Sequence, residues 1–480
     1  MRKSLVPFIG AALLGALGGC SLAPKYQRPA APVADSYPTL GAPVGDAAAG
    51  VPAADLAWQE FFRDARLQRL ISLALENNRD IRVAALNVER IRALYNIQRT
   101  ALIPSLDATG DASRRRTPGD LSFSGQPMIS ESYSVGLEMP SYEIDFFGRI
   151  ASLRDQVLQQ YLATGEARTS VQISLISAVA RQYLFILASE EQLAVARRTL
   201  EAAERSYELN KQTFDAGVNS ELDLRTSEAQ RESFRASVAS IEQQLAQDRN
   251  ALVLLVGSPL PADLPPAGSL ATQNLIEDLP EGLPSDLLVQ RPDIRAAEHS
   301  LQAANANIGI ARAAFFPSVK LTAFGGTAST ELSNLFEDGS KSWSFAPSIT
   351  VPIFASGRNK AQLAVARIEK RIEIANYEKA IQTAFREVAD TLAVRATIDT
   401  QIDAQEARVA AARRRYELSQ QRFDSGVDSF LTVLLAQQEQ FSAEQSLIGA
   451  RLARLANLTT LYAALGGGWK DANAAPVSAE

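Results

Sequence analysis

The segment YELNKQTFDAGV at residues 207–218 returns as YELSQQRFDSGV at residues 416–427, and eight of the twelve positions are identical. The offset of 209 between the two segments holds without a gap as far as Gly257 and Gly466. A chance match would not keep its spacing over tens of residues. A repeat of this length indicates two copies of one large structural unit rather than a solenoid of short repeats.

The duplication also extends toward the N-terminus. DIR at 80–82 returns at 293–295, and PS at 104–105 returns at 317–318, both at an offset of 213. In each copy the pattern predicts a helix of moderate length, two strands, a very long helix, a turn and a second helix. In chain order the predicted boundaries are a signal peptide at 1–19, a lipidated extended segment at 20–64, a first repeat at 65–256, an inter-repeat equatorial linker at 257–284, a second repeat at 285–465 and a tail at 466–480.

Heptads mark the long helix of each repeat. From Gly148 to Phe214 there is no proline, and Gly165 is the only glycine after the first position. About 67 helical residues at 1.5 Å each would make a rod of roughly 100 Å. A soluble coiled-coil dimer would account for such helices, but not for the strands that precede them. Apolar residues recur every seven positions in both copies: Val179, Ile186, Leu193, Leu200, Tyr207 and Phe214 in the first, and Ile402, Val409, Tyr416 and Phe423 in the second.

Short segments with a period of two precede the long helices. In 342–353 the odd positions are mostly apolar and the even positions are mostly small and polar, and 105–112 and 318–323 alternate in the same way. One apolar and one polar face suit a membrane barrel with a hydrated lumen, and equally suit half of a soluble sandwich. Within the two repeats we expect helices over about 65–103 and 285–316, strands at about 104–147 and 317–354, and helical hairpins at 148–256 and 357–465.

The N-terminus is typical of a targeting segment. Arg2 and Lys3 precede an apolar run at 5–17, which ends in LGGC at 17–20, a sequence that resembles a bacterial lipobox. We therefore expect lipidation at Cys20, the only cysteine. The alternative is a plain signal peptide whose cysteine happens to lie near the cleavage site. Ser21 in place of aspartate favours the outer membrane over the inner membrane.

Downstream of Cys20 no apolar run reaches the roughly 18 residues of a transmembrane helix, so we expect the chain to cross the membrane as a β-barrel or not at all. Four strands cannot close a barrel around a lumen, whereas three chains would bury every strand edge. The predicted fold class is thus mainly α with a membrane β-barrel: a homotrimer with four strands per chain, a 12-stranded β-barrel, a long periplasmic α-helical barrel and two tandem structural repeats.

The composition excludes several classes of function. A formal net charge of −6 argues against nucleic acid as a partner, because phosphate binding requires clustered basic charge. One histidine and one cysteine leave little for a metal site or a nucleophile, and His299 lies in a polar helical stretch. We expect no enzyme activity, no cofactor and no metal.

The turn after each long helix is a candidate functional site. Gly217 and Gly426 would supply the left-handed residue that ends a helix. Asn219-Ser220 and Asp428-Ser429 would then cap the return helix. Each turn would lie at the far end of a rod of roughly 100 Å, which suits docking.

Four motifs carry a family resemblance: RPDIRAAE at 291–298, AFFPS at 314–318, FGR at 147–149 and the two hairpin tips. Together they resemble the TolC superfamily over nearly the whole mature chain, and the lipobox and Ala/Pro-rich start resemble its OprM-type (NodT) lipoprotein branch. The resemblance implies a lipid-anchored outer-membrane exit duct with a large periplasmic part, in a tripartite RND multidrug efflux pump. It implies a periplasmic adaptor and an inner-membrane RND transporter as partners, besides outer-membrane lipids, with Gly217, Val218, Gly426 and Val427 meeting the adaptor.

The sequence departs from the family pattern after the second tip. Relatives commonly carry aspartate where this chain has Leu435, and Leu431 lies one helical turn earlier on the same face. We therefore expect an apolar periplasmic gate at Leu431 and Leu435, with Asp428 and Asp223 as the acidic alternatives. Other functions consistent with the sequence are the outer-membrane duct of a type I protein-secretion system and a periplasmic coiled-coil scaffold without a pore.

Overall fold

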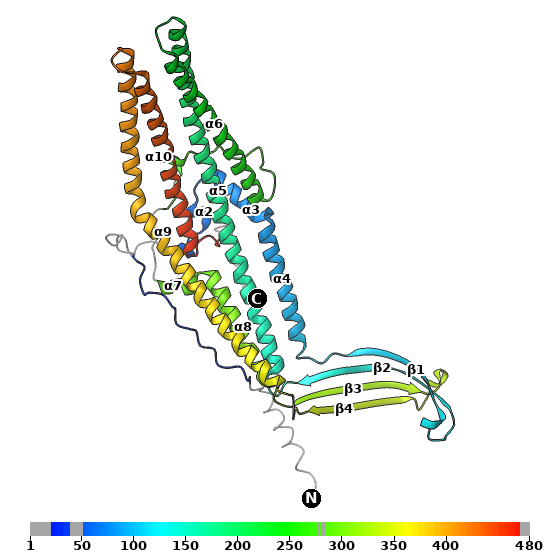
Figure 1. The fold of residues 1–480 in the computed structure, drawn as a ribbon. Helices are drawn as coiled ribbons and strands as arrows, with labels where there is room; N and C mark the ends of the chain where they lie inside the picture. Colours follow the sequence, from blue (N-terminus) through cyan, green and yellow to red (C-terminus); the bar gives the residue numbers. More distant parts are fainter. Residues whose placement is uncertain (1–20, 39–50, 274, 277–278, 280–283, 471–480) are drawn as a thin grey trace. The chain divides into compact units, whose positions relative to one another are not determined.

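A computed structural model describes residues 21–38, 51–273, 275–276, 279 and 284–470. The described chain is mainly helical and carries one four-stranded antiparallel sheet (Figure 1). It divides into two compact units, which are described separately. One contains Asn87–Gly165 and Ala296–Tyr377 with the N-terminal residues up to Ala30, and the other contains Ala31–Leu86, Glu166–Arg295 and Glu378–Glu480.

The first unit holds the sheet. Its strand order is β1-β2-β3-β4, so that each strand pairs with its neighbours in the chain, while β1 and β4 form the two edges. A shift of register between Met139 and Tyr142 accommodates Pro140, which cannot donate a ladder hydrogen bond. The strands are β1 (Asp107–Thr117), β2 (Met128–Ile144), β3 (Ser318–Ser329) and β4 (Lys341–Thr350).

The register sorts the side chains into two faces, as the alternation predicts. Across β2, β3 and β4, Leu137 pairs with Gly325 and Gly325 with Trp343. The same face carries further apolar residues at every second position along the strands. Three of them are exposed: Val135, Phe345 and Ile349. The opposite face carries serines and other small polar residues, among them Ser134, Ser342, Ser344 and Ser348.

Two helical hairpins repeat with nearly equal lengths. The helices α5 (Arg149–Asp215) and α9 (Arg358–Asp424) have 67 residues each, and α6 (Glu221–Val256) and α10 (Phe430–Ala464) have 36 and 35. In the second unit α5 lies beside α6 and α9 beside α10, as Figure 1 shows, and an ion pair links each couple: Arg197 with Glu242 at 2.6 Å, and Arg413 with Glu444 at 3.1 Å. The heptad residues Val179, Ile186, Leu193 and Val409 are buried.

One window of α5 differs from the sequence-based expectation. Within the described residues, α5 is the one helix with an 18-residue window that is long and apolar enough to cross a membrane. However, 61% of that window is buried inside the chain, as in the core helix of a globular protein. The expectation that no such apolar run exists was therefore wrong, although burial shows the window packed against protein.

The predicted helices at 65–103 and 285–316 are each broken once. The first divides at Asn78 into α3 (Ala65–Asn77) and α4 (Arg79–Thr100), and the second divides at Arg291 into α7 (Pro284–Gln290) and α8 (Pro292–Ala313). Asn78 is extended and accepts hydrogen bonds from the backbone of Asp80 and Ile81 through Oδ1. At the second break a proline follows, which disfavours helical backbone at the residue before it.

Both break residues also bind the end of a return helix. Asn78 donates to the carbonyl of Leu255 at 2.8 Å, and Arg291 donates to the carbonyl of Ala464 at 2.8 Å. Leu255 and Ala464 are related by the same offset of 209 as the hairpin segments. Arg291 is buried and additionally pairs with Asp293 at 2.6 Å and Glu387 at 2.8 Å. The breaks thus fasten each moderate helix to the hairpin of its own repeat.

Shorter elements complete the second unit. Tyr462 stacks on Phe61 with ring centroids 4.0 Å apart, and its hydroxyl donates to the carbonyl of Leu56 at 2.6 Å. This contact ties the segment at 56–61 to the end of α10. The remaining elements are η1 (Ala53–Asp55), α2 (Trp58–Phe61) and η3 (Leu270–Thr272) in the second unit, and η2 (Gly119–Leu121) and η4 (Leu332–Asn334) in the first.

Candidate functional site

The two hairpin tips have the same backbone. Gly217 has a φ of 74°, its N–H donates to Phe214 at 2.8 Å, and the N–H of Val218 donates to Thr213 at 2.9 Å. This pair of bonds ends a helix in a Schellman motif, which requires a left-handed residue. The second tip repeats the geometry: Gly426 has a φ of 73° and donates to Phe423, and Val427 donates to Arg422, both at 2.9 Å.

The four residues predicted to dock an adaptor lie on open surface. Val218 is 75% exposed and Val427 is 62% exposed, although both are apolar. A Cβ atom built on Gly217 or Gly426 meets nothing within 4 Å. Each tip therefore presents an accessible glycine followed by an accessible valine.

A side-chain bond crosses each turn. In the first tip Asn219 Nδ2 donates to Thr213 Oγ1 at 2.7 Å. In the second, Arg422 pairs with Asp428, with Nε to Oδ2 at 2.6 Å and Nη2 to Oδ1 at 3.1 Å. Arg422 and Asp428 correspond to Thr213 and Asn219 under the offset of 209. An ion pair in the second tip therefore replaces a neutral hydrogen bond in the first. The hydrogen bond from Arg422 holds the pKa of Asp428 below its usual range.

The predicted serine caps differ between the tips. Ser220 caps α6, because its Oγ accepts from the N–H of Asp223 at 3.2 Å and donates to the Asp223 carboxylate at 2.6 Å. Ser429 precedes α10 but makes no such bond, so the prediction for Ser429 was wrong. At the second tip Phe430 packs instead against Phe423, with centroids 5.3 Å apart. Aromatic packing fixes the entry to α10 where hydrogen bonding fixes the entry to α6.

The predicted gate leucines share one exposed face of α10. Leu431 is 53% exposed and Leu435 is 51% exposed. Their neighbours Phe430, Val433 and Leu434 are buried and form a core cluster with Tyr416 and Phe423 of α9. The two leucines are therefore not part of the packing within the hairpin. In a single chain they form an apolar strip beside the tip.

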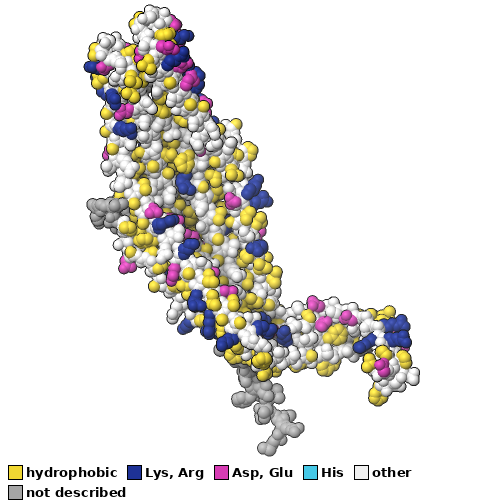
Figure 2. All heavy atoms as spheres, in the orientation of Figure 1, with side chains coloured by type: hydrophobic (Ala, Val, Ile, Leu, Met, Phe, Trp, Pro, Cys, Tyr) yellow, Lys and Arg dark blue, Asp and Glu magenta, His cyan; other side chains and the backbone are white. Residues whose placement is uncertain are grey.

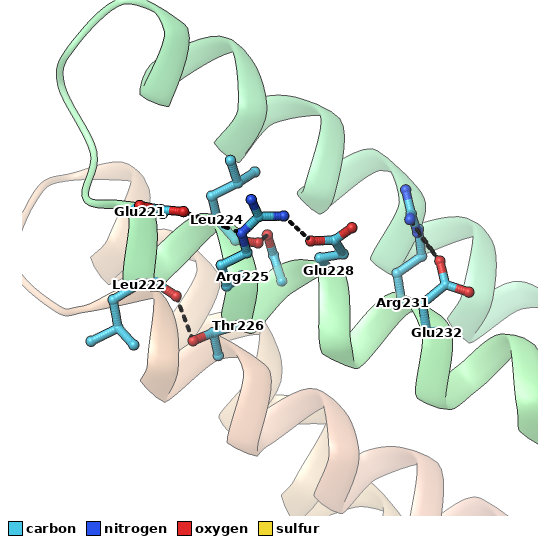
Figure 3. Close-up of polar contacts among 9 residues, drawn as sticks. Glu221, Leu222, Leu224, Arg225, Thr226, Glu228, Arg231 and Glu232 are labelled. Atoms are coloured by element: carbon cyan, nitrogen blue, oxygen red, sulfur yellow. Dashed lines mark hydrogen bonds and ion pairs between the residues drawn. The ribbon is translucent and has the colours of Figure 1, made fainter.

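Sequence reasoning missed Leu222, which precedes Leu431 by the repeat offset of 209. It is 75% exposed at the start of α6, whereas Leu224 is buried. Figure 3 shows the neighbouring polar row: Arg225 lies between Glu221 and Glu228, at 3.4 Å and 2.8 Å. Thr226 stands where the second repeat has Leu435, and its hydroxyl donates to the carbonyl of Leu222 at 2.7 Å. Applying the offset to the gate residues would have identified Leu222.

The described part of the N-terminal segment binds α8. Arg312 donates to the carbonyl of Leu22 at 2.9 Å, and Asn305 donates to the carbonyl of Pro24 at 2.8 Å. Arg28 pairs with Glu298 through two hydrogen bonds of 2.8 Å. Lower residue numbers thus lie nearer the end of α8 that leads into β3. The predicted lipidation residue, Cys20, lies outside the described residues.

Close approach of this segment depends on a small side chain. A Cβ atom on Gly309 would come within 3.0 Å of the backbone of Ala23 and within 2.6 Å of Ser152 Oγ.

Burial raises the pKa of the Tyr26 hydroxyl, and the carboxylate of Glu298 beside it adds to the rise. The hydroxyl of Tyr26 therefore stays protonated and donates to Glu298 at 3.0 Å.

Within the part of the chain that the structure describes, no three His, Cys, Asp or Glu residues are grouped to hold a metal ion. His299 Nδ1 lies 2.7 Å from the side-chain oxygen of Gln159, between two helices. The contacts at the tips stabilise the two turns, and those along α8 hold the N-terminal segment.

Residues 70–258 and 283–467 match the family model described as outer membrane efflux protein. The chain belongs to this family. It is 49% identical over 458 residues to the solvent efflux pump outer membrane protein SrpC of Pseudomonas putida, covering 94% of this chain and 96% of SrpC. It is 43% identical to the outer membrane protein OprJ of Pseudomonas aeruginosa, covering 98% of each chain.

Solved structures of this family agree. The open-state MtrE outer membrane channel of Neisseria gonorrhoeae aligns with a TM-score of 0.85 and 41% identity, over 95% of this chain and 100% of MtrE. A membrane protein of Pseudomonas aeruginosa aligns with a TM-score of 0.86 and 43% identity, over 93% and 100% of the chains. These likenesses confirm the expected TolC-type family, the fold class of trimeric channels with a helical periplasmic barrel, and the outer-membrane location.

For this member of the outer membrane efflux protein family, the expected function as the outer-membrane component of an efflux pump is also confirmed. The family consists of channels rather than enzymes. The likeness covers both repeats and nearly the whole chain, so it applies to the entire duct and not to one domain.

Proposed function

We propose that this chain, as a homotrimer, forms the exit duct of a tripartite efflux pump whose other components are a periplasmic adaptor and a proton-driven inner-membrane transporter of the RND type. In this proposal the duct conducts its cargo passively, and the inner-membrane transporter supplies the energy. The observation that carries the proposal is the four-stranded sheet with one apolar face and two unpaired edges.

Closure of the sheet requires other chains. The edge strands β1 and β4 leave a row of backbone N–H and C=O groups unpaired within the chain. Such edges are satisfied in a membrane only when a barrel closes. Three copies supply twelve strands, with the β1 edge of each copy beside the β4 edge of the next.

The gate in this proposal is apolar. Around a three-fold axis, Leu431 and Leu435 of three chains form two stacked rings. Leu222 occupies the position in the first repeat that Leu431 has in the second. A narrow apolar constriction excludes ions by dewetting, without a charged residue. Asp428 serves a different role, because its carboxylate is already paired with Arg422.

Docking and anchoring use different segments of the chain. The exposed Gly217-Val218 and Gly426-Val427 pairs are the surface offered to the adaptor, and adaptor contact favours the open form of the gate. The N-terminal segment that runs along α8 carries a thioether-linked lipid on Cys20. Relatives are named for efflux of solvents, toluene and antibiotics, and small apolar organic compounds are the cargo we propose here.

Two measurements test this function. Purified protein in planar bilayers should give single-channel events with a low resting conductance, whereas a scaffold without a pore gives none. Affinity purification from the native membrane should recover an adaptor together with an RND transporter. Recovery of an ATP-driven exporter of polypeptides would instead assign the duct to type I protein secretion.

A further inference from the structure

The apolar face of the sheet has a definite height. Six successive rows, from the pair Val319–Ile349 to the pair Tyr133–Ser329, contain one charged residue, Lys341. The ten residue-to-residue steps from Val319 to Ser329 span about 34 Å along a strand at about 3.4 Å per step. With a strand tilt of about 40°, this length gives a height of about 26 Å, close to the ~25 Å apolar band of an outer-membrane barrel.

Three consecutive arginines follow beyond this band, at the hairpin end of β1. Arg114 pairs with Glu131 and Arg116 with Ile129 in the strand register, which places both arginines on the apolar face. Arg115 pairs with Ser130 and lies on the opposite, polar face. Figure 2 shows Lys and Arg side chains gathered at this end of the sheet. Two of the three charges therefore stand directly above the apolar band.

The positive charge of these three arginines is only partly compensated by acidic residues. Arg114 forms an ion pair with Glu131 at 2.9 Å, and both side chains are accessible. Arg116 is exposed and makes no ion pair within the described part of the chain. The remaining acidic residues of this end lie in the connecting loops at 118–127 and 330–340, beyond the strands: Asp120, Glu331, Glu337 and Asp338.

We propose that Arg114 and Arg116 bind the phosphate groups of lipids in the outer leaflet of the outer membrane. A guanidinium binds phosphate oxygens through two parallel hydrogen bonds. Long basic side chains at the rim of an apolar band extend to the headgroup level while their stems cover apolar surface. This inference rests on the proposed function in one respect, which is that the hairpin end of the barrel faces outward.

The test compares lipids that differ only in phosphate. The purified trimer in detergent is titrated, by native mass spectrometry, with a bisphosphorylated acylated disaccharide and with its dephosphorylated counterpart, and inorganic phosphate is added as a competitor. We expect the phosphorylated lipid to bind at least tenfold more tightly. Inorganic phosphate at millimolar concentration should not displace it, because the acyl chains contribute to binding on the apolar face.

The arginine run supplies its own control. A basic side chain near an anionic lipid surface contributes roughly fivefold to binding, so Arg114→Gln with Arg116→Gln should weaken binding by about 25-fold. Arg115→Gln removes the same charge from the polar face and should change binding by less than twofold. Glu131→Gln removes the competing carboxylate and should tighten binding.

Three outcomes would overturn the proposal. They are equal weakening by Arg115→Gln, equal binding of the two lipids, and displacement by inorganic phosphate alone, which would indicate an anion site that does not require lipid. Conductance in planar bilayers separates this failure from failure of the duct. Wild-type protein that gives no channel would count against the proposed function. The double variant should remain a trimer with wild-type conductance, so its change in lipid binding alone tests the lipid site.

Discussion

Phe345 offers the most direct test of the strand register. It lies on the apolar face of β4 and is 58% exposed in the single chain, and it pairs with Ala323 of β3. Ile349 lies in the first row of the apolar band, four residues from Phe345. The distance between them is about 14 Å along the strand, which is about 10 Å in height at a tilt of about 40°. In a band about 26 Å tall, Phe345 therefore lies about 3 Å from the midplane.

A lipid-facing arginine destabilises a barrel most at the membrane midplane, so an arginine at position 345 should have close to the largest possible effect. For Phe345→Arg we expect a loss of about 2–4 kcal/mol per chain in the free energy of unfolding, whereas arginine near the interface costs about 0–1 kcal/mol. The assay is reversible urea unfolding of the trimer in lipid vesicles, followed by tryptophan fluorescence. Membrane insertion is measured in parallel by flotation.

The neighbouring residue is the matched control. Ser344 points to the polar face and pairs with Phe324 of β3. Ser344→Arg adds the same side chain to a hydrated lumen and should cost less than about 1 kcal/mol. If Ser344→Arg costs as much as Phe345→Arg, or if Phe345→Arg unfolds like wild type, the assignment of the two faces is refuted.

Four further predictions concern the periplasmic part. Mass spectrometry of the mature N-terminus should begin at Cys20 with added acyl mass, and an unmodified N-terminus elsewhere would contradict the lipid anchor. Serine at both Leu431 and Leu435 should sharply raise the resting conductance in planar bilayers, and unchanged conductance in a folded trimer would disprove an apolar gate. Gly426→Trp should cost about 1–2 kcal/mol for its left-handed backbone and abolish drug resistance, while Gly426→Asn, which tolerates that backbone, should retain the trimer and more of the resistance. Because the pKa of Asp428 is lowered in the folded chain, its contribution to stability is complete above the ordinary aspartate range and is lost as pH falls through the lowered value. Hydrogen-exchange protection at the second tip, corrected for the intrinsic exchange rate at each pH, should therefore fall in acid in wild type but not in Asp428→Asn.

Local sequence signals predicted a large part of this fold. The repeat offset, the heptads and the period of two depend on residues a few positions apart, because helix and strand periodicity are properties of the local backbone. The tip turns belong to the same class, since Gly217 and Gly426 are required by a local left-handed conformation. These signals placed the hairpins, the strands and the two faces of the sheet.

Contacts between distant segments decided the remainder. At the helix breaks the side chains of Asn78 and Arg291 each bind a carbonyl at the end of a return helix, 177 and 173 residues away along the chain. The exposure of Leu431 and Leu435 depends on which residues of α10 pack against α9. Periodicity alone does not specify that packing. The sequence by itself determined the elements and their repetition, whereas only the tertiary structure decided which faces were left exposed, because burial depends on partners that are remote in the chain.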